Sequence, residues 1–88
     1  MTVSAILLDA ANLIERHGWI QGAYGRPDRG YCLFGAVFEA SKYDSDNPWA
    51  ALVDQEVTGG DPIGWNDAEG RTREQVIGLL RSAAESAA

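Results

Sequence analysis

One cysteine and one histidine are the residues in this sequence best suited to chemistry. Cys32 begins an apolar segment, and a thiol at the N-terminus of a helix can have a lowered pKa and act as a nucleophile. His17 as a base, with Asn66 or Asp67 to orient it, would complete a Cys-His-Asx set. No local catalytic signature surrounds Cys32, and a small buried residue at a helix contact is the simpler interpretation. We therefore expect no catalytic residue and no enzyme activity.

Candidate metal and phosphate ligands are few. If Asp44 is taken as the first position of a calcium loop, Pro48, Trp49 and Gln55 occupy positions five, six and twelve. Such a loop needs glycine at position six and glutamate at position twelve. One cysteine and one histidine make a zinc site within the chain improbable and exclude an internal disulfide. The glycine-rich segment 22–30 lacks the Gly-Lys-Ser/Thr of a phosphate loop, so we expect no metal and no cofactor.

The charge distribution limits the classes of partner. The net charge is −6, and eight acidic residues but only one basic residue, Lys42, lie between Glu39 and Glu69. Nucleic-acid binding depends on clustered Lys and Arg, so direct binding to nucleic acid is not expected. The acidic segment 39–69 could instead imitate nucleic acid and block a DNA-binding protein. A solvated acidic surface that aids solubility is the simpler interpretation.

Two groups of side chains remain as binding candidates. The arginines would form an anion-binding patch if the two loops that carry them lie together, although arginines are more often solvated charges; they are Arg26, Arg29, Arg71 and Arg73. The tryptophans are expected mainly in the core, which needs large apolar side chains in a small domain. An exposed Trp19 or Trp49 would instead be an interface anchor, because tryptophan is enriched in binding hot spots.

The spacing of apolar residues predicts mainly helices. A helix is expected over residues 3–16, capped by Thr2 or Ser4 and ended by Gly18. Residues 31–43 predict a second helix, in which small residues at i, i+4 and i+8 allow a close helix contact. A third, short helix is expected from Pro48 to the Thr58 break. The glycine-rich segment between the first two helices predicts a loop, or alternatively a hairpin that pairs Trp19–Gln21 with Tyr31.

The segment "WNDAEGR" precedes the last predicted helix. Thr72 and Gln75 have the spacing of a capping box. In this motif the Thr72 hydroxyl accepts from the Gln75 backbone amide, and the Gln75 side chain accepts from the Thr72 backbone amide. Asn66 and Asp67 are residue types that favour turns, and Trp65 is expected to enter the core. We therefore predict that this segment is a turn that positions the last helix, with a structural rather than a binding role.

Length and composition favour one small soluble domain. The chain has 88 residues and a hydrophobic fraction of 45%, which predicts a single domain (1–88) with modest stability. Its N-terminal segment has neither a basic leader nor a long apolar run, so we expect no signal peptide and no membrane span. The single cysteine suits the reducing cytoplasm. The fold expected is a small all-α helical bundle of three to four helices, and homodimerisation would be one way to add stability.

Three segments together resemble a family of unknown function found in actinobacteria and their phages. They are "LIERHGWIQGAYGR", "YCLFGAV" and "WNDAEGRTREQVIGLLRSAA". The resemblance covers roughly Ile6 to Ala84, and its most specific part is Trp-Asn-Asp followed by Gly-Arg-Thr. This chain departs from the family pattern at Leu33, Phe34 and Val37, which stay apolar. The resemblance implies a fold and a source but no activity, and no catalytic or binding residue is carried over from it.

These observations lead to three functional hypotheses. The first is a non-enzymatic protein-interaction module, of phage or actinobacterial origin, that modulates a host protein. The alternatives are an acidic nucleic-acid mimic and, less favoured, an enzyme that uses Cys32.

Overall fold

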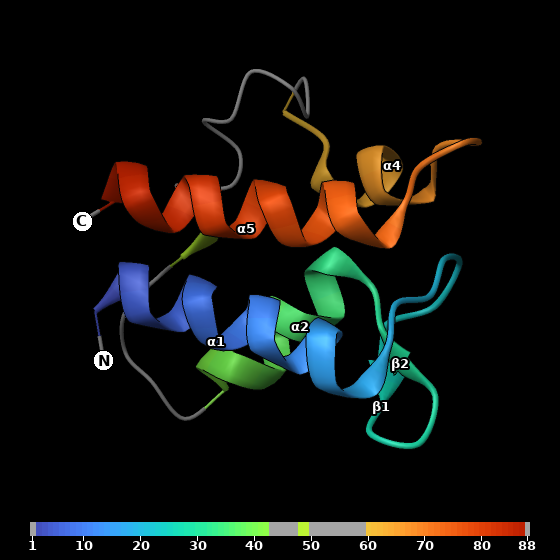
Figure 1. Cartoon of the computed structure of the whole chain (residues 1–88), viewed down its shortest axis with the longest axis horizontal. Coiled ribbons are helices and arrows are strands. Elements are labelled where there is room, and N and C mark those ends of the chain that lie inside the picture. Colours follow the sequence, from blue (N-terminus) through green and yellow to red (C-terminus); the bar gives the residue numbers. More distant parts are fainter. Residues whose placement is uncertain (1, 43–47, 50–59, 88) are drawn as a thin grey trace.

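A computed structural model describes residues 2–42, 48–49 and 60–87 of the chain. In these residues it has four helices and one short hairpin (Figure 1). In chain order the elements are α1 (Val3–His17), β1 (Gly25–Arg26), β2 (Gly30–Tyr31), α2 (Leu33–Ser41), α4 (Pro62–Asp67) and α5 (Arg73–Ala87). The predicted small helical bundle, with a hairpin between its first two helices, is confirmed.

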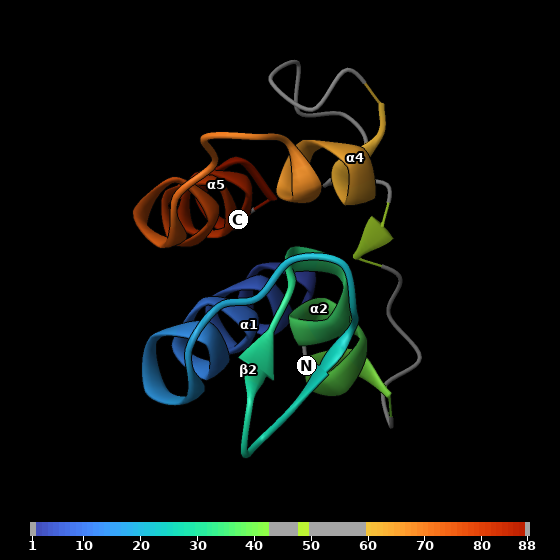
Figure 2. The ribbon, with the colours of Figure 1, turned by 90° about the vertical axis from the view of Figure 1, so that its right-hand side faces the viewer.

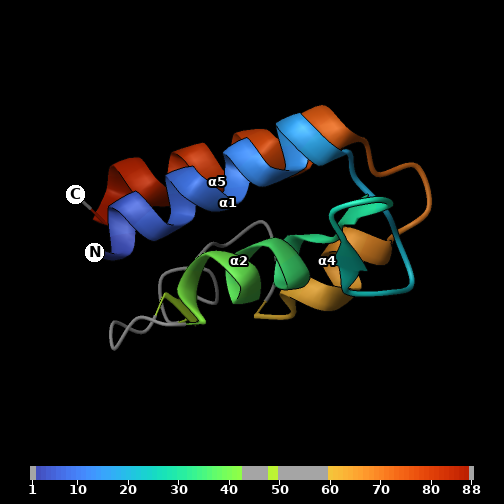
Figure 3. The ribbon, with the colours of Figure 1, turned by 90° about the horizontal axis from the view of Figure 1, so that it is seen from below.

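The helices form two layers. The long helices α1 and α5 lie side by side and run antiparallel, so that both termini lie at the same end of the molecule (Figure 1). The Ser4 hydroxyl links them there by donating to the carbonyl oxygen of Ala84 at 2.8 Å. The shorter helices α2 and α4 make the second layer (Figure 3), with α2 beside α1 and α4 beside α5 when the bundle is turned to its end (Figure 2).

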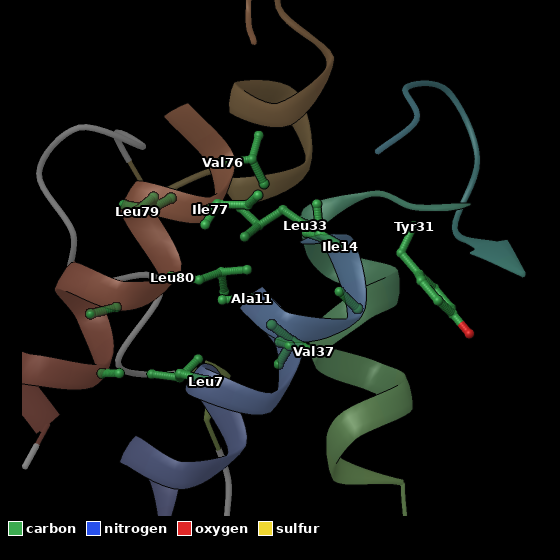
Figure 4. Close-up of a cluster of buried hydrophobic side chains, with 14 residues drawn as sticks. Leu7, Ala11, Ile14, Tyr31, Leu33, Val37, Val76, Ile77, Leu79 and Leu80 are labelled. Carbon is green, nitrogen blue, oxygen red and sulfur yellow. The ribbon is translucent and has the colours of Figure 1, made fainter. Parts of the chain in front are cut away.

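The core lies where α1, α2 and α5 meet (Figure 4). Aliphatic side chains at helical spacing make up most of it, as the sequence pattern predicts. Burial of these side chains supplies the main stabilising free energy of the fold. The cluster consists of Leu7, Ala10, Ala11, Ile14, Tyr31, Leu33, Ala36, Val37, Val76, Ile77, Leu79, Leu80, Ala83 and Ala84.

The ends of α1 and α5 follow local capping chemistry. Thr2 is the N-cap of α1, and its hydroxyl accepts from the Ala5 amide at 3.1 Å. At the start of α5, the Thr72 hydroxyl accepts from the Gln75 amide at 3.2 Å while the Gln75 side chain accepts from the Thr72 amide at 3.0 Å. The predicted capping box is therefore present. Helix α5 continues to Ala87, through most of the small-residue tail.

The second predicted helix is confirmed, but over a shorter range than 31–43: α2 runs from Leu33 to Ser41, Cys32 is its N-cap, and Tyr31 belongs to β2. Ala36 is fully buried in the core, as expected for a close helix contact. Gly35 does not face the helix contact; it packs against the backbone of Tyr24 in the preceding loop. A Cβ atom at this position would lie 1.9 Å from the carbonyl oxygen of Tyr24, so only glycine lets the loop lie against the helix.

The hairpin differs from the one considered from the sequence. Strand β1 pairs antiparallel with β2, with Gly25 opposite Tyr31 and Arg26 opposite Gly30. The earlier segment predicted as the first strand contributes one parallel bridge, between Trp19 and Tyr31. Tyr31 therefore pairs with Gly25 on one side and with Trp19 on the other. The chain reverses direction twice between Trp19 and Tyr31, whereas a simple hairpin needs one reversal. Gly25 begins β1 with a φ of 110°, which other residues rarely adopt, and a Cβ atom there would lie 2.1 Å from the carbonyl oxygen of Gly30 in the paired strand.

The segment "WNDAEGR" is only partly a turn, and here the prediction was wrong. Trp65, Asn66 and Asp67 are the last residues of α4. The helix was missed because its start signals are compact: the Asp61 side chain accepts from the Gly64 amide at 3.0 Å, and Pro62 occupies the first turn. The turn itself occupies residues 68–72. The short helix predicted from Pro48 falls largely outside the described residues.

Candidate functional site

The side chain of Asn66 is the only described polar side chain in the buried core, with 1% of its surface exposed. Its carbonyl oxygen accepts from the Trp19 indole N–H at 2.7 Å and from the Leu33 amide at 2.9 Å. Its amide nitrogen donates to the Ile20 carbonyl at 3.3 Å and to the Asp67 carboxylate at 2.9 Å. Both ends of the amide are satisfied, so Asn66 has a structural role.

Further bonds close the same region. The Gln21 side-chain nitrogen donates to the backbone carbonyls of Asn66 and Ala68, each at 3.0 Å. The Gly22 amide donates to the Asp67 carboxylate at 3.0 Å. We call this set the Asn66 junction. It joins three segments distant in sequence through the residues Trp19, Ile20, Gln21, Gly22, Leu33, Asn66 and Asp67.

Trp65 and Arg71 support the junction from its outer side. Trp65 is half-buried and packs against the core, as predicted. The Arg71 guanidinium lies 3.9 Å from the centroid of the Trp65 ring, and its Nε donates to the Trp65 carbonyl at 2.8 Å. A stacked and hydrogen-bonded arginine of this kind fixes the turn between α4 and α5. This contact gives the Gly-Arg-Thr part of the motif a structural role too.

The candidates for a Cys-His-Asx set each make other contacts. Cys32 is buried, with 4% exposed, and its sulfur accepts from the Gly35 amide at 3.2 Å. Burial raises the pKa of its thiol, and the charge of Asp67 adds to that rise. The His17 Nδ1 lies 3.1 Å from the Pro27 carbonyl, and its ring meets the edge of Tyr31. A raised thiol pKa is the opposite of what a cysteine nucleophile needs.

Two of the four candidate arginines have structural contacts. Arg71 is held on Trp65, and Arg73 donates to the Glu15 carbonyl at 2.9 Å. Arg26 and Arg29 flank the turn of the hairpin and are exposed. An anion-binding patch that uses all four arginines stays a prediction, and it would have to compete with these contacts.

An exposed aromatic surface was not foreseen. Tyr24 is 62% exposed and Phe38 is 57% exposed. Both line a hollow of ≈ 370 Å³. We call it the aromatic hollow; its lining residues are Tyr24, Gly25, Tyr31, Phe34, Gly35, Phe38 and Glu39. The Phe34 ring lies between the exposed Tyr24 and the partly buried Trp49: its centroid is 5.4 Å from that of Tyr24 and 4.3 Å from that of Trp49, on which it stacks.

The sequence contained a sign of this surface. Apart from Gly35, the buried positions of α2 are Leu33, Ala36 and Val37, spaced as one helical stripe. Phe34 and Phe38 are four residues apart and lie outside that stripe, so they share another face of the helix.

The two tryptophans considered as interface anchors have different surroundings. Trp19 packs against the core and donates to the Asn66 junction. Trp49 is partly buried beneath Phe34. Tyr24 also lines a neighbouring hollow of ≈ 320 Å³ together with Ile63, which is 41% exposed. The exposed apolar side chains near α2 are therefore Tyr24, Phe38 and Ile63 rather than a tryptophan.

A family model described as a family of unknown function (DUF6197) matches residues 1–86. The chain belongs to this family. The expected membership in a family of unknown function, over nearly the whole chain, is thereby confirmed. No curated protein and no solved structure matches the chain significantly. The family supplies no activity, so a function for this member has to be argued from its own residues.

The part of the chain that the structure describes contains neither a membrane-spanning helix nor a metal-binding cluster. None of its helices combines the length and the apolar character that crossing a membrane requires. No group of three or more His, Cys, Asp or Glu residues lies in a position to hold a metal ion.

Proposed function

We propose that this family member is a non-enzymatic protein-interaction module and that the aromatic hollow is its contact surface. One observation carries the proposal: Tyr24 and Phe38, two large aromatic side chains, are each more than half exposed and line one hollow. Exposing such side chains to water is unfavourable, and neighbouring exposed apolar groups commonly mark an interaction site. Aromatic side chains are also enriched among the residues that contribute most to binding.

The positions of the other candidates support a binding role over an enzymatic one. Cys32 caps α2 from a buried position, and Asn66 uses its whole amide in the junction. A catalytic role for either residue would remove a contact that holds the fold. The aromatic hollow, by contrast, contains large side chains whose exposed surface has no structural use in the described residues.

The partner and the setting belong to the same proposal. The protein acts in the cytoplasm, as a single domain of phage or actinobacterial origin, and modulates a host protein. Phe38 and Tyr24 provide the anchors in place of Trp19 and Trp49, with Trp49 supporting the hollow from beneath Phe34.

The test is capture from an actinobacterial lysate with tagged wild type, Phe38→Ala and Leu8→Ala. Leu8 is a matched control, because it is an exposed apolar helix residue, 44% exposed, on α1. We expect one protein to be captured by wild type and Leu8→Ala but lost, by about tenfold or more, with Phe38→Ala. Equal capture by all three variants would refute the proposal.

The acidic-mimic alternative is separated in the same experiment. Residues 43–47 and 50–59 of the acidic segment 39–69, with four of its eight acidic side chains, lie outside the described residues, so the hypothesis stays a prediction. Binding through that segment would weaken steeply with added salt and would not respond to Phe38→Ala. A DNA-binding protein captured with that behaviour would favour mimicry.

A further inference from the structure

We propose that the aromatic hollow receives a cationic side chain, an arginine or a lysine, from a basic segment of the partner protein. This inference rests on the proposed function and adds the chemistry of the partner. Three properties of the hollow carry it: its size, its aromatic walls and its charge.

The size of the hollow suits one long side chain. Its volume of ≈ 370 Å³ lies near the lower end of the range for small-molecule sites, which is about 300–1,000 Å³. Two of its lining residues, Gly25 and Gly35, have no side chain, and this leaves space between the rings. At Gly35 the Tyr24 carbonyl occupies the place of a Cβ, so the loop that carries Tyr24 is held close to α2.

The walls present aromatic rings to an incoming group. Tyr24, Phe34 and Phe38 line the hollow with Tyr31 at its inner side. The Tyr24 and Phe34 rings lie 5.4 Å apart and are inclined at 35°, so they do not stack face to face in parallel. Aromatic faces carry negative electrostatic potential and attract ammonium and guanidinium groups, and rings grouped around one space are a recurring way to hold such cations.

The charges near the hollow favour a cation over an anion. Glu39 lines the hollow, and none of the other described residues that line it is charged. The negative charges of Glu39 and Asp28 both act on Tyr31 at the inner wall, with Lys42 acting in the opposite sense. The chain as a whole carries a net charge of −6, which steers basic partners toward it.

Lys42 is the local competitor for Glu39. Its ammonium lies 2.8 Å from the Glu39 carboxylate, and both side chains are 36% exposed. Exposed pairs at this spacing contribute little to stability. An arginine from a partner can therefore share or replace this contact, and it would also meet the ring faces that line the hollow.

Three capped tripeptides test the inference by NMR: acetyl-Gly-Arg-Gly-amide, its citrulline analogue and its norleucine analogue. Citrulline keeps the shape of arginine without the charge, and norleucine keeps an apolar stem. We expect the arginine peptide to shift the amide signals of Gly25, Gly35 and Phe38 and to bind about tenfold more tightly than the other two. Equal binding of the three peptides, or no shift with any, would overturn the inference.

Variants at Tyr24 separate the ring from a general apolar contact. Tyr24→Phe keeps the aromatic face and should keep binding of the arginine peptide. Tyr24→Leu should weaken it several-fold, and Glu39→Gln should weaken it and reduce its salt dependence. Since Tyr24 and Glu39 are at least partly exposed, these variants should fold. Undiminished binding by Tyr24→Leu would place the peptide elsewhere and contradict the inference.

The capture experiment keeps this inference separate from the proposed function. Capture that depends on Phe38, combined with no preference for arginine, would overturn the cationic anchor and leave the interaction module standing. Capture that is independent of Phe38 would overturn the module, and with it the assignment of a protein partner to the hollow.

Discussion

The Asn66 junction and the aromatic hollow both include residues of α2, and their chemistry is opposite. In the junction every polar group of a buried amide has a partner, and the exposed fraction of Asn66 is 1%. In the hollow, large apolar rings contact water. The first arrangement lowers the free energy of the folded chain, since each buried donor and acceptor is satisfied. The second raises it, and a binding partner would relieve that cost.

The comparison shows that the most distinctive sequence motif is not the one proposed to bind a partner. Trp-Asn-Asp is the most distinctive motif in the sequence, and its side chains are fully used in holding three segments together. The exposed aromatic pair lies in the less distinctive segment "LFGAVF". Substitutions in the junction should therefore change stability, whereas substitutions in the hollow should change binding.

The largest effect is expected from Asn66→Ala. It leaves the Trp19 indole N–H and the Leu33 amide without their acceptor, at about 1–3 kcal/mol each, so the free energy of unfolding should fall by about 2–6 kcal/mol. Denaturation with urea measures it. Trp19→Phe removes one donor only and should cost about 1 kcal/mol. Values near zero for both would show that the junction is not the polar centre of the fold.

A smaller effect is expected from Gly35→Ala. The new Cβ would lie 1.9 Å from the Tyr24 carbonyl oxygen, so the loop must move, at a cost of about 1–3 kcal/mol. Gly78→Ala is the control, because Gly78 lies within α5 with nothing within 4 Å of a Cβ. It should stabilise the protein by up to about 1 kcal/mol.

Gly35→Ala should also change binding at the aromatic hollow. Moving the loop displaces Tyr24 from the hollow, so binding of the arginine peptide should weaken while Gly78→Ala leaves it unchanged. Intact binding in Gly35→Ala would show that the hollow does not depend on this close approach.

The smallest effect concerns Cys32, which caps α2 between the two regions. Because burial raises the thiol pKa in the folded state, the folded chain holds the proton more tightly than the unfolded chain does. The resulting stability is complete below the ordinary thiol pKa and is lost as the pH rises through the folded value. Tyr31 behaves in the same way at still higher pH, since burial also raises the pKa of its hydroxyl.

Cys32→Ser isolates this contribution. Serine keeps an N-cap acceptor and does not titrate in this range. We expect the stability of wild type, measured by urea denaturation from pH 7 to 10, to fall relative to that of Cys32→Ser as the pH rises. Alkylation of the folded wild type by iodoacetamide should be slow at neutral pH. Fast alkylation in the folded state would contradict the buried, protonated thiol and would reopen the enzyme hypothesis.

Features that are specified by residues close together in the sequence were predicted, and features that depend on distant contacts were not. The helices at 3–16 and after Thr72 were predicted closely, because apolar spacing and the capping residues lie within the helix itself. The role of Trp65-Asn66-Asp67 as structural was expected, but their helix was not, because a six-residue helix has no apolar period to recognise. Apart from Asp67, the partners of the Asn66 side chain lie 33 to 47 residues away, and no local pattern specifies them.

The aromatic hollow was missed for a related reason. Phe34 and Phe38 lie outside the buried stripe that Leu33, Ala36 and Val37 form on α2, but that stripe does not specify what lies beside the other face of the helix. Tyr24 joins them only through the hairpin and the contact at Gly35. A surface built from a loop and one helix face depends on tertiary structure, so a single sequence could not have placed it.

The antiparallel pairing of α1 with α5 has a consequence for synthesis of the chain. Helix α1 leaves the ribosome before α5 and packs along its length against it, as the Ser4 contact with Ala84 illustrates. That face of α1 therefore stays exposed until α5 has been made, and its burial requires closing the long loop of residues 18–72. A nascent chain interrupted before α5 would be exposed to aggregation and proteolysis.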